Sequence, residues 1–210
     1  MNRRKKLYLN TGTALFKPIS HFGVWIHSSK VYLSYFGSDV NGLVTSITRF
    51  LSVISFLELG VGPVIQSNLY KPLAEKDSDA ISKIVVSSEK FYRRIAYIFL
   101  IYIAVLIFIF PRFNSEYDFV FTVSLLVIIS ISTFAQYYFG ITYQVFLNAD
   151  QKVYVQSSLQ IITVILNTII SIILMKLGFG IHVVKLASTI VYFIRPLAQY
   201  VYVRRNYKIN

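Results

Sequence analysis

The chain has 210 residues, of which 55% are hydrophobic and 14% are charged, and it contains no cysteine. Soluble domains carry about 25% charged residues, so this composition excludes a soluble enzyme. The absence of cysteine excludes a disulfide-stabilised scaffold and thiolate metal sites. The 21 Lys and Arg residues outnumber the 9 Asp and Glu residues. At about 20 residues per crossing, the length accommodates six membrane helices joined by short loops.

The first predicted span covers residues 7–36 and follows a basic segment at residues 3–6. Lys17 and Pro18 interrupt the apolar run that a cleaved signal peptide requires, so we predict a membrane helix with a cytoplasmic anchor. Lys17 lies about 15 Å from the inner surface at about 1.5 Å per residue. His21 and His27 are about 120° apart around such a helix, so we do not expect them to bind a metal together.

The second predicted span, residues 43–70, contains Arg49 and Glu58. Charged residues within a membrane usually face a bundle interior or an aqueous cavity. Glu58 is expected at the same depth as Lys17 on an antiparallel neighbour, so these two residues could form an ion pair. Arg49 is expected about 10 Å below the outer end of the span, where it either faces a cavity or extends to the outer interface.

The sequence Gly60-Val61-Gly62-Pro63 lies within the second span. Glycine lowers helix stability and proline removes a backbone hydrogen bond, so we predict a kink or hinge at Gly60, Gly62 and Pro63. Transporters place such interruptions where a helix bends between two states. The alternative is a helix-packing contact made by small residues.

A cytoplasmic segment at residues 71–94 follows the second span. Its apolar residues recur near helical spacing among charged ones: Ile81, Ile84, Val85 and Phe91. This pattern predicts a short amphipathic helix lying on the inner leaflet, with Asp77 or Ser78 as its N-cap. The alternative is a solvated hairpin.

The next three predicted spans cover residues 94–111, 119–144 and 153–175, which carry no charge after Arg94. Their β-branched and aromatic residues would favour strands in water, but an isolated span in lipid must satisfy its own backbone and is therefore helical.

The sixth predicted span, residues 181–203, is interrupted by polar residues and a proline: His182, Lys185, Arg195 and Pro196. Lys185 is near the outer end and is predicted to extend to the interface. Arg195 is deeper and is the better candidate for a cavity.

The basic residues predict the orientation of this all-α membrane protein. With both termini inside, three cations lie outside, at Lys30, Arg112 and Lys176, and four lie within spans. The remaining 14 of the 21 lie inside: Arg3, Arg4, Lys5, Lys6, Lys71, Lys76, Lys83, Lys90, Arg93, Arg94, Lys152, Arg204, Arg205 and Lys208. Cytoplasmic loops carry such an excess, so we predict six spans with both termini in the cytoplasm and no nucleic-acid partner.

The sequence contains no G-x-S-x-G, P-loop or H-E-x-x-H motif, and Glu58 is the one carboxylate expected at membrane depth. We therefore predict no catalytic residues, no cofactor and no metal. An integral membrane glycosyl- or acyltransferase is the enzyme alternative.

Five strings, in order along the chain, resemble one family: Tyr35-Phe36-Gly37, Asn41-Gly42-Leu43, F-L-S-V-I-S-F-L-E-L-G-V-G (50–62), N-L-Y-K-P-L-A-E-K-D (68–77) and F-L-N-A-D-Q-K-V-Y (146–154). Together they resemble the polysaccharide-export flippases, the O-antigen and teichoic-acid branch of the multidrug/oligosaccharidyl-lipid/polysaccharide superfamily. This family moves polyprenyl-pyrophosphate-linked oligosaccharides across the bacterial plasma membrane.

The resemblance implies two lobes around a cationic cavity that opens alternately to each side. It makes Arg49 the first candidate for binding the pyrophosphate, Lys17 the second and Arg195 the third, because cationic side chains hold phosphate groups well. Glu58 would carry a coupling proton or form a structural ion pair with Lys17.

Family members are usually more than twice as long, so residues 1–210 correspond to one lobe, the N-terminal one. We therefore expect a second lobe as partner, either another chain or a second copy, besides the lipid-linked oligosaccharide and membrane lipids. The alternatives are a multidrug or cation antiporter of the same superfamily and a non-transporting membrane subunit of a polysaccharide-synthesis complex.

Overall fold

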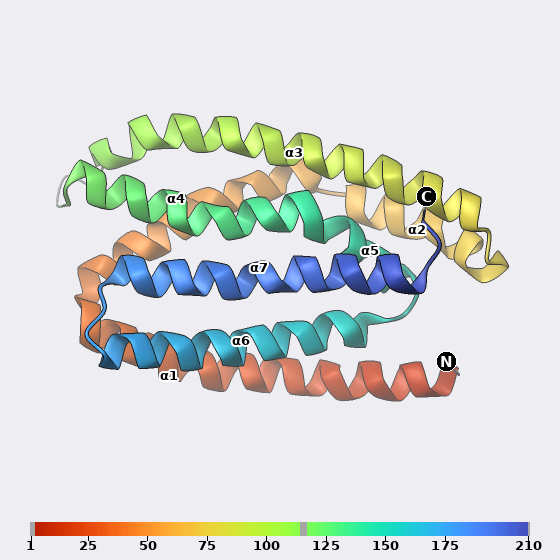
Figure 1. The fold of residues 1–210 in the computed structure, drawn as a ribbon, viewed down its shortest axis with the longest axis horizontal. Helices are drawn as coiled ribbons and strands as arrows, with labels where there is room; N and C mark the ends of the chain where they lie inside the picture. Colours follow the sequence, from red (N-terminus) through yellow and green to blue (C-terminus); the bar gives the residue numbers. More distant parts are fainter. Residues whose placement is uncertain (1–2, 114–116, 210) are drawn as a thin grey trace.

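The chain folds into a bundle of long helices (Figure 1). The structure is a computed structural model that describes residues 3–113 and 117–209, with side chains for residues 4–15, 18, 31–112 and 117–209. The described residues form seven α-helices and no strand. The helices are α1 (Arg3–Ser52), α2 (Val61–Glu75), α3 (Ser78–Phe113), α4 (Phe119–Ala135), α5 (Ile141–Ala149), α6 (Val153–Lys176) and α7 (Ile181–Asn206). A 3-10 helix, η1 (Val53–Glu58), precedes α2, and a π-helical turn, η2 (Gln136–Gly140), joins α4 to α5.

The helices run back and forth along the long axis of the molecule (Figure 1). The two ends of the chain lie at the same end of the bundle, together with the α2–α3 turn and the α5–α6 connection. The kink within α1 and the α6–α7 connection lie at the opposite end. α7 packs against both α6 and α4, and α6 packs against α1.

The first two predicted spans are joined by a single residue. Gly37 has φ 78° and ψ 173°, and helical residues flank it on both sides within α1. This backbone conformation is essentially restricted to glycine. The second span was predicted to begin at residue 43. This bound was wrong, because the second helical arm begins at residue 38.

The second arm is interrupted where the sequence predicts a kink. The α-helix ends at Ser52, η1 continues to Glu58, and Gly60 then takes a left-handed φ of 84° before α2 begins. Pro63 lies in the first turn of α2, where a missing backbone N–H breaks no helical hydrogen bond.

The segment at residues 71–94 is helical but does not form a separate surface helix. It contains the end of α2, a left-handed residue at Lys76 and the start of α3, which continues without a break to Phe113. The Asp77 carboxylate caps α3 by accepting the N–H groups of Asp79 (3.1 Å) and Ala80 (3.0 Å). The side chains of Ile81 and Val85 are buried against other helices. The prediction of a separate short helix is corrected accordingly, because these residues belong to α2 and to the long helix α3.

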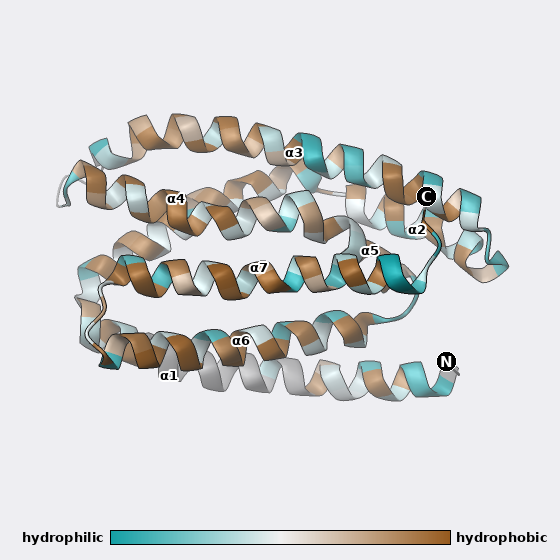
Figure 2. Cartoon of the chain, viewed as in Figure 1, coloured by the Kyte–Doolittle hydropathy of each residue, from teal (hydrophilic) through white to brown (hydrophobic). Residues whose placement is uncertain are grey.

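Five described segments are long and apolar enough to cross a membrane: Val31–Glu58, Ser78–Arg112, Phe119–Ala149, Val153–Lys176 and Ile181–Asn206. The side chains of 14 of the 30 residues in the first predicted span, residues 7–36, lie outside the described set. Hydrophobic residues dominate the bodies of α4, α6 and α7, and hydrophilic ones gather at the end that holds the C-terminus (Figure 2). The chain is a multi-pass membrane protein with these five candidate spans.

Candidate functional site

Arg49 lies on an exposed face of the second arm of α1. Exposed hydroxyl side chains accompany it, and each donates to a backbone carbonyl of its own helix: Thr45 to Asn41, Thr48 to Val44 and Ser52 to Arg49. These hydroxyls are therefore satisfied internally. The Arg49 guanidinium belongs to none of the ion pairs or hydrogen bonds found among the described side chains. It is the exposed, unpaired charge of a polar face.

Glu58 ends η1 at the break in the second span and is half-buried. Its carboxylate lies close enough to Tyr92 and Tyr137 to interact with both electrostatically. Tyr92 and Tyr137 are themselves buried in the core. Glu58 therefore faces the bundle interior, whereas Arg49 faces outward. The side chain of Lys17 lies outside the described residues, so its pairing with Glu58 stays a prediction.

Gly62, in the first turn of α2, packs close to neighbouring helices. A Cβ added there would meet the Tyr92 hydroxyl at 3.7 Å and the Val145 side chain at 3.8 Å, which are ordinary contact distances. Gly60 has open space around it, and its left-handed φ is what requires glycine. Of the predicted hinge residues, Gly60 is therefore needed for its backbone conformation, and Gly62 makes a close packing contact.

Arg195 lies beside the π-helical turn η2. One of its guanidinium nitrogens donates to the Gln136 amide oxygen at 3.4 Å, and the Gln136 amide nitrogen donates to the Gln144 amide oxygen at 3.1 Å. Gly140 allows η2 to approach α7 closely, because a Cβ at this position would lie 3.0 Å from the Pro196 Cβ. Arg195 and Arg49 are thus held differently: Arg195 is half-buried and bonded to an amide, and Arg49 is exposed.

Lys185 does not extend to the outer interface as predicted. It lies in the wall of a cavity of about 270 Å³ between α1, α4, α6 and α7. Its ammonium nitrogen is 4.5 Å from the centre of the Tyr32 ring, on α1. Sequence reasoning missed this site. The signal was present in the hydroxyl residues that follow Lys185 at helical spacing, Ser188, Thr189 and Tyr192, which line the same cavity.

Glu89 is a charged residue that sequence reasoning treated as part of an inner-surface helix. It is buried, and its carboxylate pairs with Arg204 of α7 at 3.1 Å and with Arg93 at 3.7 Å. It also accepts a hydrogen bond from the Tyr143 hydroxyl. Arg204 in turn donates to the Ile209 carbonyl at 3.1 Å. This network ties α3, α5, α7 and the C-terminal residues together.

Asp150, in the A-D-Q-K string, organises a second network at the same end of the bundle. Its carboxylate pairs with Lys6 at 3.1 Å and with Lys152 at 3.1 Å, and it accepts the Tyr207 hydroxyl. Burial alone would raise the pKa of the Asp150 carboxyl. The hydrogen bonds from Tyr207, Lys6 and Lys152, with the positive charge of Lys152, outweigh burial and lower this pKa below its usual value. The string therefore anchors both ends of the chain to the α5–α6 connection.

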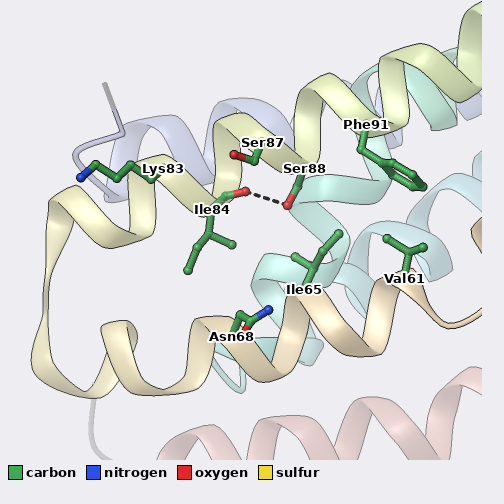
Figure 3. Close-up of a pocket in the computed structure, with 8 residues that line it drawn as sticks. All are labelled: Val61, Ile65, Asn68, Lys83, Ile84, Ser87, Ser88 and Phe91. Carbon is green, nitrogen blue, oxygen red and sulfur yellow. Dashed lines mark hydrogen bonds between the residues drawn. The ribbon is translucent and has the colours of Figure 1, made fainter.

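An apolar groove of about 410 Å³ separates α2 from the first half of α3 (Figure 3). Val61 and Ile65 of α2 face Ile84 of α3 across it. The Ser88 hydroxyl, at the edge of the groove, donates to the Ile84 carbonyl at 2.7 Å. The Lys83 side chain points away from the groove. The groove thus offers apolar surface and space, and no convergent polar groups.

Comparison with protein-family models, curated proteins and solved structures gives no match. The family resemblance therefore rests on the five strings quoted above. In the part of the chain that the structure describes, no three histidine or carboxylate side chains are grouped as metal ligands. The polar features available for function are the Arg49 face, the Arg195–Gln136 contact and the Lys185 cavity.

Proposed function

We propose that the chain is one lobe of a transporter that moves polyprenyl-pyrophosphate-linked oligosaccharides across the bacterial plasma membrane by alternating access. A second lobe, either another chain or a second copy, would complete the transport cavity. In this arrangement six crossings place both termini in the cytoplasm, in line with the inside excess of basic residues. The observation that carries the proposal is that Arg49 is exposed and is unpaired among the described side chains.

Arg49 lies twelve residues after the turn at Gly37, which is about 18 Å along the helix at about 1.5 Å per residue. This depth is near the middle of a hydrocarbon core of about 30 Å. A charge placed there against lipid costs about 2.5–3.5 kcal/mol on insertion scales. We therefore infer that this face is covered by a polar surface and not by lipid. A guanidinium there suits a pyrophosphate, because it can hold two phosphate oxygens in one planar fork.

The interrupted second span supports alternating access. The arm that carries Arg49 is separated from α2 by η1 and the left-handed Gly60. Membrane transporters build their substrate sites from discontinuous helices of this kind. A bend at Gly60 would change the direction of the Arg49 arm relative to α2, and this would move the polar face between the two membrane surfaces.

The experiment is binding followed by transport. The purified chain in nanodiscs is titrated with a labelled short-chain polyprenyl-pyrophosphate oligosaccharide and, separately, with the matching polyprenyl alcohol. Loss of a charge-assisted contact is worth about 1.5–3 kcal/mol, so Arg49→Gln should weaken pyrophosphate binding about tenfold or more. Arg94→Gln removes an exposed arginine from α3 and should leave binding unchanged.

Equal affinity for the pyrophosphate in wild type and Arg49→Gln would refute the role of Arg49. Export of polymer is then measured in cells that lack their own flippase, with the chain expressed alone and together with a candidate second lobe. A non-transporting subunit would give the same export with Arg49→Gln as with wild type.

A further inference from the structure

We propose that the cavity at Lys185 binds a small anionic group. The ligand would be either a dissolved inorganic anion, such as chloride or phosphate, or the phosphate of a lipid headgroup. This site lies inside the single bundle, between α1, α4, α6 and α7, and it is separate from the outward-facing Arg49. Anion binding at Lys185 would not require the transport function proposed above.

The lining of the cavity mixes polar and apolar side chains and contains one charge. The residues that bear on anion binding are Tyr32, Thr133, Asn167, Ser171, Lys185 and Tyr192. No aspartate or glutamate is among the described residues that line the cavity. Lys185 also takes no part in the ion pairs found among the described residues. Within the described part of the chain, its ammonium group therefore has no carboxylate to balance it.

The Tyr32 ring contacts the ammonium group but does not neutralise it. A ring face at 4.5 Å attracts a cation through its quadrupole but carries no net charge of its own. An uncompensated charge away from water is costly, whereas an anion in the cavity would balance it. The Tyr32 hydroxyl donates to Ser171 at 3.2 Å, so it is not directed to the ammonium group.

Two hydroxyls in the lining, those of Thr133 and Tyr192, keep a proton that could be donated to an anion. The Thr133 hydroxyl makes no hydrogen bond among the described residues. The Tyr192 hydroxyl accepts from the Asn167 amide at 3.3 Å, which leaves its own proton free. Ser171 is not such a donor, because Ser188 donates to the Val184 carbonyl at 2.9 Å and the Ser171 proton is therefore directed to Ser188 at 3.4 Å. A cation with neighbouring hydroxyl donors and no carboxylate is the donor set that an anion requires.

A cation would find an unfavourable charge in this cavity, and water alone would leave the charge of Lys185 unbalanced. The Asn167 amide oxygen has no hydrogen-bond partner among the described residues, and as an acceptor it requires a donor such as a water. An anion that keeps part of its hydration could present a water to this oxygen.

The test is anion binding to the full chain, purified in a chloride- and phosphate-free gluconate buffer. Sodium chloride and sodium phosphate are titrated separately by calorimetry, and the midpoint of thermal unfolding is followed in parallel. We expect saturable binding of one anion per chain. Lys185→Met should weaken it by about tenfold or more, because contacts to charged groups are worth about 1.5–3 kcal/mol. Lys176→Met, which removes an exposed lysine at the end of α6, is the matched control and should leave the affinity unchanged.

Tyr192→Phe tests the same site without removing its charge. It deletes one donor hydroxyl and should weaken binding by about two- to tenfold. Nanodiscs of zwitterionic and of anionic lipid separate the two sources of the anion. A Lys185-dependent stabilisation that only anionic lipid produces assigns the site to a headgroup phosphate, and one that the salts produce assigns it to a dissolved anion. The proposal would be overturned if neither the salts nor anionic lipid gave a Lys185-dependent effect, that is, if wild type and Lys185→Met responded equally to both.

Discussion

Replacing Glu89 with glutamine should be among the most destabilising polar substitutions in the chain. Only 10% of the Glu89 side chain is exposed, and it faces Arg204 at 3.1 Å. Glutamine keeps the shape of glutamate but removes its charge, so Arg204 loses its nearest anion. Breaking a fully buried ion pair costs about 3–5 kcal/mol. Because 31% of the Arg204 side chain is exposed, water compensates part of this loss, and we expect about 2–3 kcal/mol.

The assay is equilibrium unfolding of the purified protein in mixed micelles, in wild type and in three variants: Glu89→Gln, Arg204→Gln and the double substitution. If the pair stabilises the bundle directly, the double variant is destabilised by less than the sum of the two single variants. The matched control is Glu75→Gln, because Glu75 pairs with Lys71 at 4.0 Å and both side chains are mostly exposed. Such surface pairs are worth about 0.5 kcal/mol or less.

Two results would refute this reasoning. One is a cost for Glu89→Gln that is no larger than the cost for Glu75→Gln. The other is strict additivity in the double variant, which would mean that Glu89 and Arg204 act independently.

Three further substitutions test the backbone and the second ionic network. Gly37→Ala should cost about 1–3 kcal/mol of unfolding free energy, because its φ of 78° with ψ 173° is strained for alanine. Gly140→Ala should cost about 1–3 kcal/mol, since the new Cβ would lie 3.0 Å from the Pro196 Cβ. Asp150→Asn should destabilise the protein at neutral pH, and its difference from wild type should shrink as the pH falls below the usual aspartate pKa of about 3.9.

The direction of the pH effect follows from the lowered pKa of Asp150 in the folded protein. A carboxyl that binds its proton less readily when folded contributes stability above its unfolded pKa, and this contribution is lost as the pH falls through the folded pKa. A pH-independent difference between wild type and Asp150→Asn would contradict this assignment.

For the glycines, the control is Gly42→Ala, because Gly42 is helical and nothing lies within 4 Å of the Cβ position. A cost for Gly42→Ala equal to that for Gly37→Ala would contradict the strain argument.

The sequence predicted the features that depend on local chemistry. Charge-free runs predicted the later spans closely, because a segment in lipid must be helical whatever its propensity, and α6 begins at Val153 as predicted. Gly60 and Pro63 predicted the interruption of the second span. The predicted bounds left residues 37–42 between the first two spans, whereas Gly37 alone separates the two helical arms.

The missed residues depend on partners far away in the sequence. Glu89 is buried because Arg204, 115 residues later, lies against it. Lys185 is near the start of α7, so its position alone favoured the outer interface. In the structure, α1 packs against α6 and α4 packs against α7, and the Lys185 ammonium group lies over the Tyr32 ring. Neither arrangement can be derived from the hydropathy of a single span.

The predicted hinge at Gly60 lies between two separate parts of the hydrophobic core. Residues of the Arg49 arm, including Ile47 and Leu51, are buried in one cluster, and Leu69 of α2 is buried in the other. Ile65 of α2 packs against both clusters, so a bend at Gly60 would have to repack this residue. α3 passes through both clusters without a break, so α2 would have to move relative to α3. The groove between α2 and α3 leaves apolar space for this movement (Figure 3).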